Sequence, residues 1–180
     1  SSKVETDLNN FRFIDLSEKD GMRVYQRSTT FLLIAAAKRI VPECHILVNH
    51  HITGGYFCEF TNESYCTEDN IKAIEFEMKK MVAQELPIEK SIMSIAEAMP
   101  YFKAHGQEDK IKLFKYRRTS TINMYTLDGV KDYFYGYMLR NTRDIKLFKL
   151  IPYAYGFILQ FPDEKNPNVL PEFKSQPKLS

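Results

Sequence analysis

The sequence lacks tryptophan and has only three cysteines in 180 residues. These cysteines (Cys44, Cys58 and Cys66) form no CxxC pair, which predicts free thiols and excludes a disulfide framework or a cysteine-rich zinc site. The longest apolar run, Phe31 to Ala37, is about a third of the length that a bilayer span needs. We therefore expect a cytoplasmic protein without a membrane partner. The 25 basic and 23 acidic residues nearly cancel, so bulk charge alone does not predict nucleic-acid binding.

Common catalytic motifs are also missing. The sequence has no GxxxxGK(S/T) loop for a nucleoside triphosphate, no GxGxxG, no GxSxG and no HExxH. Among the four histidines only His50 and His51 are adjacent, and neighbours on a strand point to opposite faces. They are therefore not expected to share a metal, although either one is a candidate ligand-binding residue. We expect no metal and no cofactor in this segment.

What is present predicts an α+β domain with a mostly antiparallel sheet and about three helices. Ser28 to Thr30 supply N-cap candidates for a first helix, and Thr67 and Ser94 begin two more. A short strand at Met22 to Tyr25 is expected to pair with one at Phe11 to Leu16. The predicted helices are 31–40, 68–86 and one that starts at 94, and the other predicted strands are 44–52, 56–60, 121–125, 133–139, 145–151 and 155–161.

The densest aromatic segment runs from Lys131 to Met138. With a period of two, Tyr133, Tyr135 and Tyr137 would share one face of a strand. Such a face could stack on a base, a sugar or a peptide, or it could pack beneath a helix. Cations lie nearby in the sequence, and a cation beside an exposed ring is typical of single-stranded RNA binders; those cations are Arg117, Arg118 and Lys149.

Several segments resemble the second amino-terminal (editing) domain of threonyl-tRNA synthetases. They include the Phe31–Ile40 run, the Gly55–Phe60 hairpin strand, Thr67–Ile71, Ile74–Lys80 and Phe148–Leu150. The resemblance extends from about residue 26 to residue 161 and implies an editing-domain-like fold. It rests on many loosely specified positions.

A second resemblance is to bacterial uridine (nucleoside) kinase-like proteins, which carry a TGS domain, an editing-like domain and a P-loop kinase. Its segments are Arg23–Ser28, Gln107–Lys110, Asp132–Met138 and Gly156–Pro162. It implies three parts: the end of a TGS-like domain at 1–25, the editing-like domain at 26–161, and a strap at 162–180 toward a kinase. ATP and Mg²⁺ would then belong to the kinase, an ATP-dependent nucleoside phosphotransferase, and the TGS and kinase domains of the same chain would be partners.

The editing pocket of the synthetase family is built from an HxxxH and a CxxxH. Aligning the resembling segments places the first motif on Arg27 and Phe31 and the second on Phe134 and Met138. None of these four side chains can serve as a metal ligand or a general base in that hydrolysis. The resemblance therefore implies the fold without the hydrolysis, and we expect Phe31, Phe134 and Met138 to fill the cleft.

These observations predict a non-catalytic accessory or regulatory domain of a uridine kinase-like protein. Two alternatives stay open. One is a module that binds tRNA or a nucleotide through the tyrosine segment and its neighbouring cations. The other is a residual aminoacyl-tRNA deacylase whose site would be rebuilt around His50, His51 or Cys58.

Overall fold

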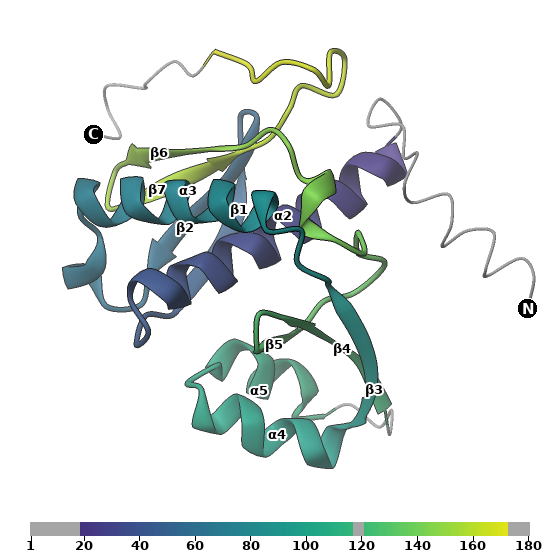
Figure 1. Ribbon diagram of the computed structural model, residues 1–180. Coiled ribbons are helices and arrows are strands. Elements are labelled where there is room, and N and C mark those ends of the chain that lie inside the picture. The colour runs from purple at the N-terminus through teal and green to yellow at the C-terminus, as the bar shows by residue number, and fades with distance from the viewer. Residues whose placement is uncertain (1–18, 117–120, 173–180) are drawn as a thin grey trace, which may run out of the picture.

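The computed structural model describes residues 19–116 and 121–172 and shows an α+β protein with two antiparallel sheets. Figure 1 shows the larger sheet with helices α2 (Lys19–Ile40) and α3 (Glu68–Ala83) in the upper part of the molecule, and the smaller sheet with α4 (Ile95–Ala104) and α5 (Glu108–Phe114) below. This arrangement confirms the predicted fold class. No helix among the described residues is long and apolar enough to cross a membrane.

The larger sheet has four strands in the order β1-β2-β7-β6. Its strands are β1 (Ile46–Ile52), β2 (Gly55–Phe60), β6 (Lys149–Tyr153) and β7 (Gly156–Gln160). The hairpin predicted around Gly54 and Gly55 is confirmed, with Ile46 opposite Phe60 in the register. Every residue of β7 is buried, as expected for a central strand that the rest of the fold covers on both faces.

The helices on this sheet are α2 (Lys19–Ile40) and α3 (Glu68–Ala83). Thr67 caps α3 as predicted, because its side chain accepts a hydrogen bond from the Asn70 N–H. The two helices pack against each other and against the sheet around a core that includes Leu32, Ile74 and Leu159.

The start of α2 corrects two predictions. Met22 to Tyr25 is helical, so the strand predicted there is wrong, and the predicted partner at Phe11 to Leu16 lies outside the described residues. Ser28, Thr29 and Thr30 are not N-caps either. Their hydroxyls donate to the carbonyls of Val24, Tyr25 and Gln26 inside the helix, an alternative use of the same side chains. The predicted boundary after residue 25 falls within this continuous helix.

The smaller sheet has three strands in the order β3-β4-β5. They are β3 (Glu89–Ser94), β4 (Thr121–Leu127) and β5 (Val130–Tyr133). Helices α4 (Ile95–Ala104) and α5 (Glu108–Phe114) cover one face through a second core that includes Phe102, Phe114 and Met124. The Ser94 cap of α4 is confirmed, since Ser94 Oγ accepts from the Glu97 N–H at 3.1 Å.

The chain between β5 and β6 differs from its prediction. A strand was predicted at 133–139, but the observed strand β5 ends at Tyr133, and residues 134–139 form no regular strand. The reason lies at Gly136, whose φ of +104° belongs to a region that side-chain-bearing residues rarely adopt. Two 3₁₀ turns, Glu63–Tyr65 and Thr142–Asp144, complete the described elements.

The three cysteines are free, as predicted. Burial raises the pKa of Cys58 to about 12, which keeps that side chain a neutral thiol at neutral pH. The deacylase alternative includes Cys58 among the residues around which a site would be rebuilt, and a buried thiol with a raised pKa is poorly suited to nucleophilic or ligand chemistry.

Candidate functional site

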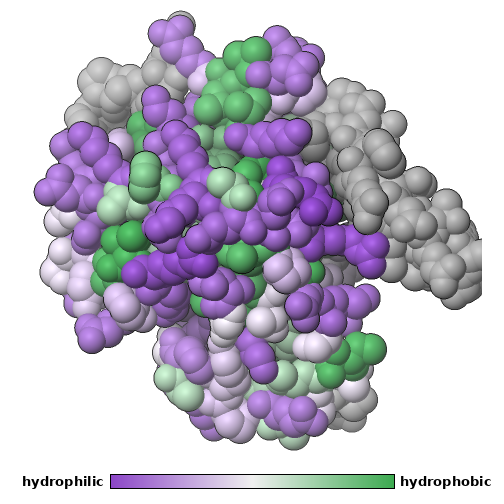
Figure 2. Space-filling model, in the orientation of Figure 1, coloured by the Kyte–Doolittle hydropathy of each residue, from purple (hydrophilic) through white to green (hydrophobic). Residues whose placement is uncertain are grey.

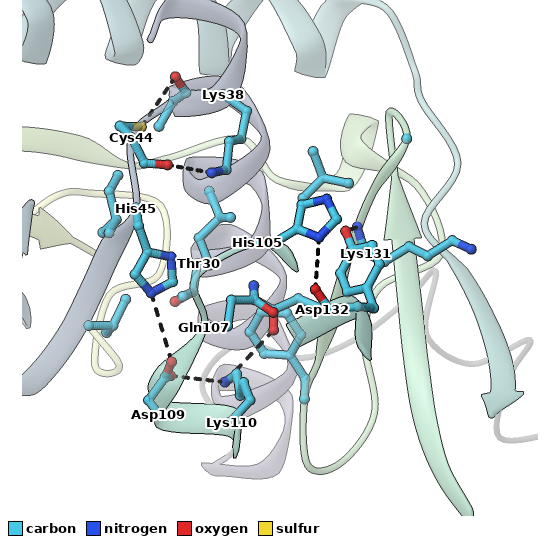
Figure 3. Close-up of a pocket in the computed structure, with 18 of the residues that line it drawn as sticks. Thr30, Lys38, Cys44, His45, His105, Gln107, Asp109, Lys110, Lys131 and Asp132 are labelled. Atoms are coloured by element: carbon cyan, nitrogen blue, oxygen red, sulfur yellow. Dashed lines mark hydrogen bonds and ion pairs between the residues drawn. The ribbon is translucent and has the colours of Figure 1, made fainter. Parts of the chain in front are cut away.

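A cavity of about 360 Å³ lies between α2 and the start of β1 on one side and α4, α5 and β5 on the other. We call it the inner cavity. Its volume is at the lower end of the range of small-molecule sites, about 300–1,000 Å³. Figure 3 shows side chains from separate elements converging on it, among them His45, Gln107, Asp109, Lys110 and Asp132.

Charged side chains form a chain along one wall of the inner cavity. His45 Nε2 lies 3.8 Å from Asp109 Oδ1, and Lys110 Nζ lies 3.7 Å from Asp109 Oδ2. Lys110 Nζ is also 3.8 Å from Oδ1 of Asp132. These separations allow electrostatic attraction but exceed hydrogen-bond length. The backbone N–H of Lys110 donates to the Gln107 carbonyl at 3.1 Å. Its ammonium makes no direct hydrogen bond to a residue in the described ranges and lies 5.9 Å from the centre of the Phe134 ring.

Asp132 is the most deeply buried acid of this wall, with 3% of its surface exposed. Its backbone neighbour helps to hold it, because the Tyr133 N–H donates to Asp132 Oδ1 at 2.7 Å. Burial raises the pKa of Asp132, and the Lys110 ammonium opposes this shift. The pKa of Asp109 moves the other way, because the His45 ring beside it favours the charged carboxylate.

Gln107 stands just before α5 and is 6% exposed. Its Oε1 is buried and accepts no hydrogen bond from the described part of the chain. An unsatisfied buried acceptor costs about 1–3 kcal/mol, so such groups are uncommon in folded proteins. The wall of the inner cavity therefore holds an acceptor without a hydrogen bond, a buried carboxylate, and an ammonium that makes two ion pairs but no short hydrogen bond.

The four positions aligned with the editing motifs lie together where α2 meets the segment after β5. The Phe31 and Phe134 ring centres are 5.1 Å apart. Phe31 is fully buried, Met138 is 5% exposed in the same core, and Phe134 packs against that core while also lining the inner cavity. Apolar side chains thus occupy three of the four aligned positions, Phe31, Phe134 and Met138.

Arg27, one turn before Phe31 on α2, also contacts the segment after β5. Its Nη1 donates to the carbonyl oxygen of Tyr137 at 2.6 Å. A Cβ at Gly136 would come within 2.6 Å of the Arg27 guanidinium carbon, so glycine leaves room for this contact. The Leu139 N–H also donates to Ser28 Oγ at 2.8 Å, and the segment is therefore tied to α2 at two places.

The three candidate tyrosines do not share a face, so that prediction is wrong. Tyr133 is buried against Phe114, with ring centres 4.8 Å apart. Tyr135 is 82% exposed and Tyr137 is 54% exposed. The period of two fails because the strand ends at Tyr133 and the chain turns at Gly136.

Tyr135 and Tyr137 border a second, more open depression of about 630 Å³ over the smaller sheet. We call it the outer groove. Lys90, Ile92 and Asn123 also line it. Figure 2 shows exposed polar and apolar patches side by side on the face of the molecule in view. Arg117 and Arg118 lie outside the described residues.

The remaining candidates are placed elsewhere. Lys149 is exposed at the start of β6 in the larger sheet. His50 and His51 are exposed on β1, where His50 contacts the Phe57 ring and His51 contacts the Tyr56 ring. In the described ranges no group of three or more His, Cys, Asp or Glu side chains could hold a metal ion.

The inner cavity was not predicted from the sequence. In the sequence, Gln107, Asp109 and Lys110 stood out only as part of a segment that resembles another family. Asp132 stood out only as a neighbour of the tyrosines. One signal was available in the sequence: an aspartate inside an aromatic strand is unusual, because acids are rarely fully buried without a partner.

Comparison with known proteins shows a consistent likeness, although no family model matches the chain. It is 30% identical to the threonine–tRNA ligase of Listeria welshimeri over 139 residues, which is 77% of this chain and 22% of that protein. It is 28% identical to the ligase of Lawsonia intracellularis over 144 residues, and 28% identical to that of Methylococcus capsulatus over 158 residues. These matches cover 80% and 87% of this chain.

The chain spans about a quarter or less of the length of these relatives, 22% to 25% in the three cases. The chain is thus an α+β domain that is similar in sequence to one part of threonine–tRNA ligases. These matches support the predicted resemblance to threonyl-tRNA synthetases.

Proposed function

We propose that this chain is a non-hydrolytic accessory domain built on an editing-domain-like fold. The observation that carries the proposal is the packing of Phe31 against Phe134, with ring centres 5.1 Å apart, where the resemblance places two motif residues. A reactive water needs space and polar neighbours. Two packed aromatic rings supply neither.

The donor set at these positions supports the same proposal. A zinc-activated water requires about three nitrogen, sulfur or carboxylate ligands. Phe31, Phe134 and Met138 supply at most a weak thioether, and Arg27 is a permanent cation that cannot act as a base at neutral pH. Its guanidinium is already bonded to the Tyr137 carbonyl.

The wider context is part of the proposal. The second resemblance leads us to propose that the domain belongs to a cytoplasmic uridine kinase-like protein and acts between a TGS domain and a kinase. ATP and Mg²⁺ would bind in the kinase. A phosphoryl-transfer assay with this segment, ATP and uridine should give only background turnover, and a rate above background would contradict this assignment.

We expect no deacylation of misacylated tRNA by this domain. Purified protein would be incubated with a threonine-accepting tRNA that has been mischarged with serine. The rate at which the aminoacyl ester is lost would be compared with the uncatalysed rate. The expected result is no acceleration, because no base or metal ligand lies at the aligned positions. A threonine–tRNA ligase assayed in parallel provides the positive control. Acceleration that disappears in a His50→Ala, His51→Ala double variant would overturn the proposal in favour of a rebuilt hydrolytic site.

A second candidate function, RNA binding, is favoured by the outer groove. The described residues that line it include the cation Lys90 and exposed aromatic rings, and none of them is an aspartate or glutamate. A basic, aromatic surface suits an unpaired base and its phosphate. The similarity to threonine–tRNA ligases makes tRNA a reasonable partner to test. Of the predicted cations, Lys149 lies in the larger sheet and not in the groove, and Arg117 and Arg118 lie outside the described residues.

If RNA binds in the outer groove, Tyr135→Ala should weaken binding of a single-stranded oligonucleotide by roughly five- to a hundredfold. This range corresponds to about 1–3 kcal/mol of base stacking. Fluorescence anisotropy at two salt concentrations would measure it, and affinity should fall as salt rises. Tyr155→Ala is the matched control, since Tyr155 is also exposed but lies in the larger sheet's β6–β7 turn. Equal losses for both variants, or no binding at low salt, would eliminate this function.

A further inference from the structure

We propose that the inner cavity binds a small zwitterion, a molecule with a carboxylate and an ammonium group on neighbouring atoms. This inference goes beyond the accessory role and supplies the ligand that such a domain would sense. It rests on two groups whose hydrogen-bonding capacity the described residues leave unused. These groups are Oε1 of Gln107 and the ammonium of Lys110.

The Gln107 Oε1 atom sets the first requirement. It is an acceptor on a side chain that is 6% exposed, and it accepts no hydrogen bond in the described ranges. Because the atom itself is buried, the Gln107 amide has to turn toward the cavity when a ligand binds. A ligand that reaches it must therefore carry an N–H or O–H group. The buried carboxylate of Asp132 belongs to the same wall and makes a positively charged donor preferable to a neutral one.

The Lys110 ammonium sets the second requirement. It can donate three hydrogen bonds, yet both of its carboxylate neighbours lie at 3.7–3.8 Å. A ligand carboxylate in contact with Lys110 would form the short, charge-assisted hydrogen bond that these neighbours do not provide. Phe134, against which the ammonium lies, closes this part of the wall.

The charges around the cavity argue against a ligand of one sign. Lys38, Lys110 and Lys131 line it together with Asp109 and Asp132. A simple anion would meet the two carboxylates, and a simple cation would meet the Lys110 ammonium. The Lys38 ammonium is bonded to the Cys44 carbonyl, and the Lys131 side chain points away from the other labelled polar groups (Figure 3). A zwitterion avoids both penalties because each of its ends can face the opposite charge. The volume of about 360 Å³ is several times the roughly 30 Å³ of one water and admits a small amino acid.

The test is calorimetric titration of the full 180-residue chain with glycine, L-alanine and L-serine. Acetate supplies the carboxylate alone, and glycine ethyl ester supplies the ammonium alone. The expected result is saturable binding of at least one zwitterion and at least tenfold weaker binding of both single-charge probes, about 1.4 kcal/mol. Glycine ethyl ester also separates a free zwitterion from an aminoacyl ester, because the ester lacks the carboxylate that Lys110 would hold.

Variants at Gln107 test the assignment of the acceptor. Gln107→Leu removes Oε1 at similar size and should weaken binding at least tenfold, while leaving the unliganded fold as stable as before or more so. Gln107→Glu keeps an acceptor and should retain binding. Amide shifts of residues 107–110 and 130–134 in the unmodified chain provide a readout that needs no variant.

Three results would overturn the proposal: no saturable binding of any of the three zwitterions, equal binding of the ester, or undiminished binding by Gln107→Leu. None of them bears on hydrolysis, which the deacylation assay measures separately. The accessory role and the ligand can therefore fail independently.

Discussion

Phe31→Ala should lower the free energy of unfolding by about 3–5 kcal/mol, the usual cost of truncating a buried phenylalanine. Phe31 is fully buried and packs on Phe134, so the substitution leaves a cavity between α2 and the segment after β5. For a chain of this size the melting temperature should fall by roughly 10 °C. Urea unfolding followed by circular dichroism would measure the change.

The matched control for this prediction is Phe76→Ala. Phe76 is 71% exposed on α3, so its removal should change stability by no more than about 0.5 kcal/mol. If Phe31→Ala were as mild as the control, the region between α2 and Phe134 would not be a packed core. The central argument against a hydrolytic cleft would then be lost.

Lys110→Met should destabilise the domain by about 2 kcal/mol at neutral pH, because it leaves the Asp132 carboxylate buried without its cation. Removing one partner of a fully buried pair typically costs about 3–5 kcal/mol. We expect less here because Lys110 is partly exposed and its ammonium is 3.8 Å from the carboxylate. Lys112→Met, an exposed position on the same helix, is the matched control and should change little.

The pH dependence of this effect identifies its cause. Burial raises the pKa of Asp132 above its ordinary value of 3.8. The folded state therefore holds a proton that the unfolded state has lost, and stability falls as pH rises from about 4 through the raised pKa. Without Lys110 that pKa should rise further, so the deficit of Lys110→Met should grow between pH 4 and pH 8. A deficit independent of pH would point to lost packing instead of the unpaired carboxylate.

Local sequence signals predicted those elements whose hydrogen bonds and burial lie close together in the chain. The Gly54-Gly55 turn predicted the β1–β2 hairpin, and the caps at Thr67 and Ser94 predicted the starts of α3 and α4. In each of these cases the group that ends or caps the element lies within three residues of the backbone it satisfies.

Predictions failed where a local signal had two possible uses. The hydroxyls of Ser28 to Thr30 can cap a helix or bond within one, and packing of Met22 and Tyr25 into the core favours the longer helix. The alternating tyrosines could have formed a strand, but Tyr133 packs against α5 and the chain turns at Gly136. Helix α5 was not predicted because it is only seven residues long.

By itself, the sequence determined the fold class, the free thiols and the apolar or cationic character of the four aligned positions, since these depend on residue type and local spacing. Only the tertiary structure decided which side chains share a cavity. Thr30 and Asp132 stand about a hundred residues apart, and His45 meets Asp109 only because α5 packs beside the start of β1. Burial and unused hydrogen bonds, which give Gln107, Lys110 and Asp132 their chemistry, arise from that packing and have no counterpart in the order of residues.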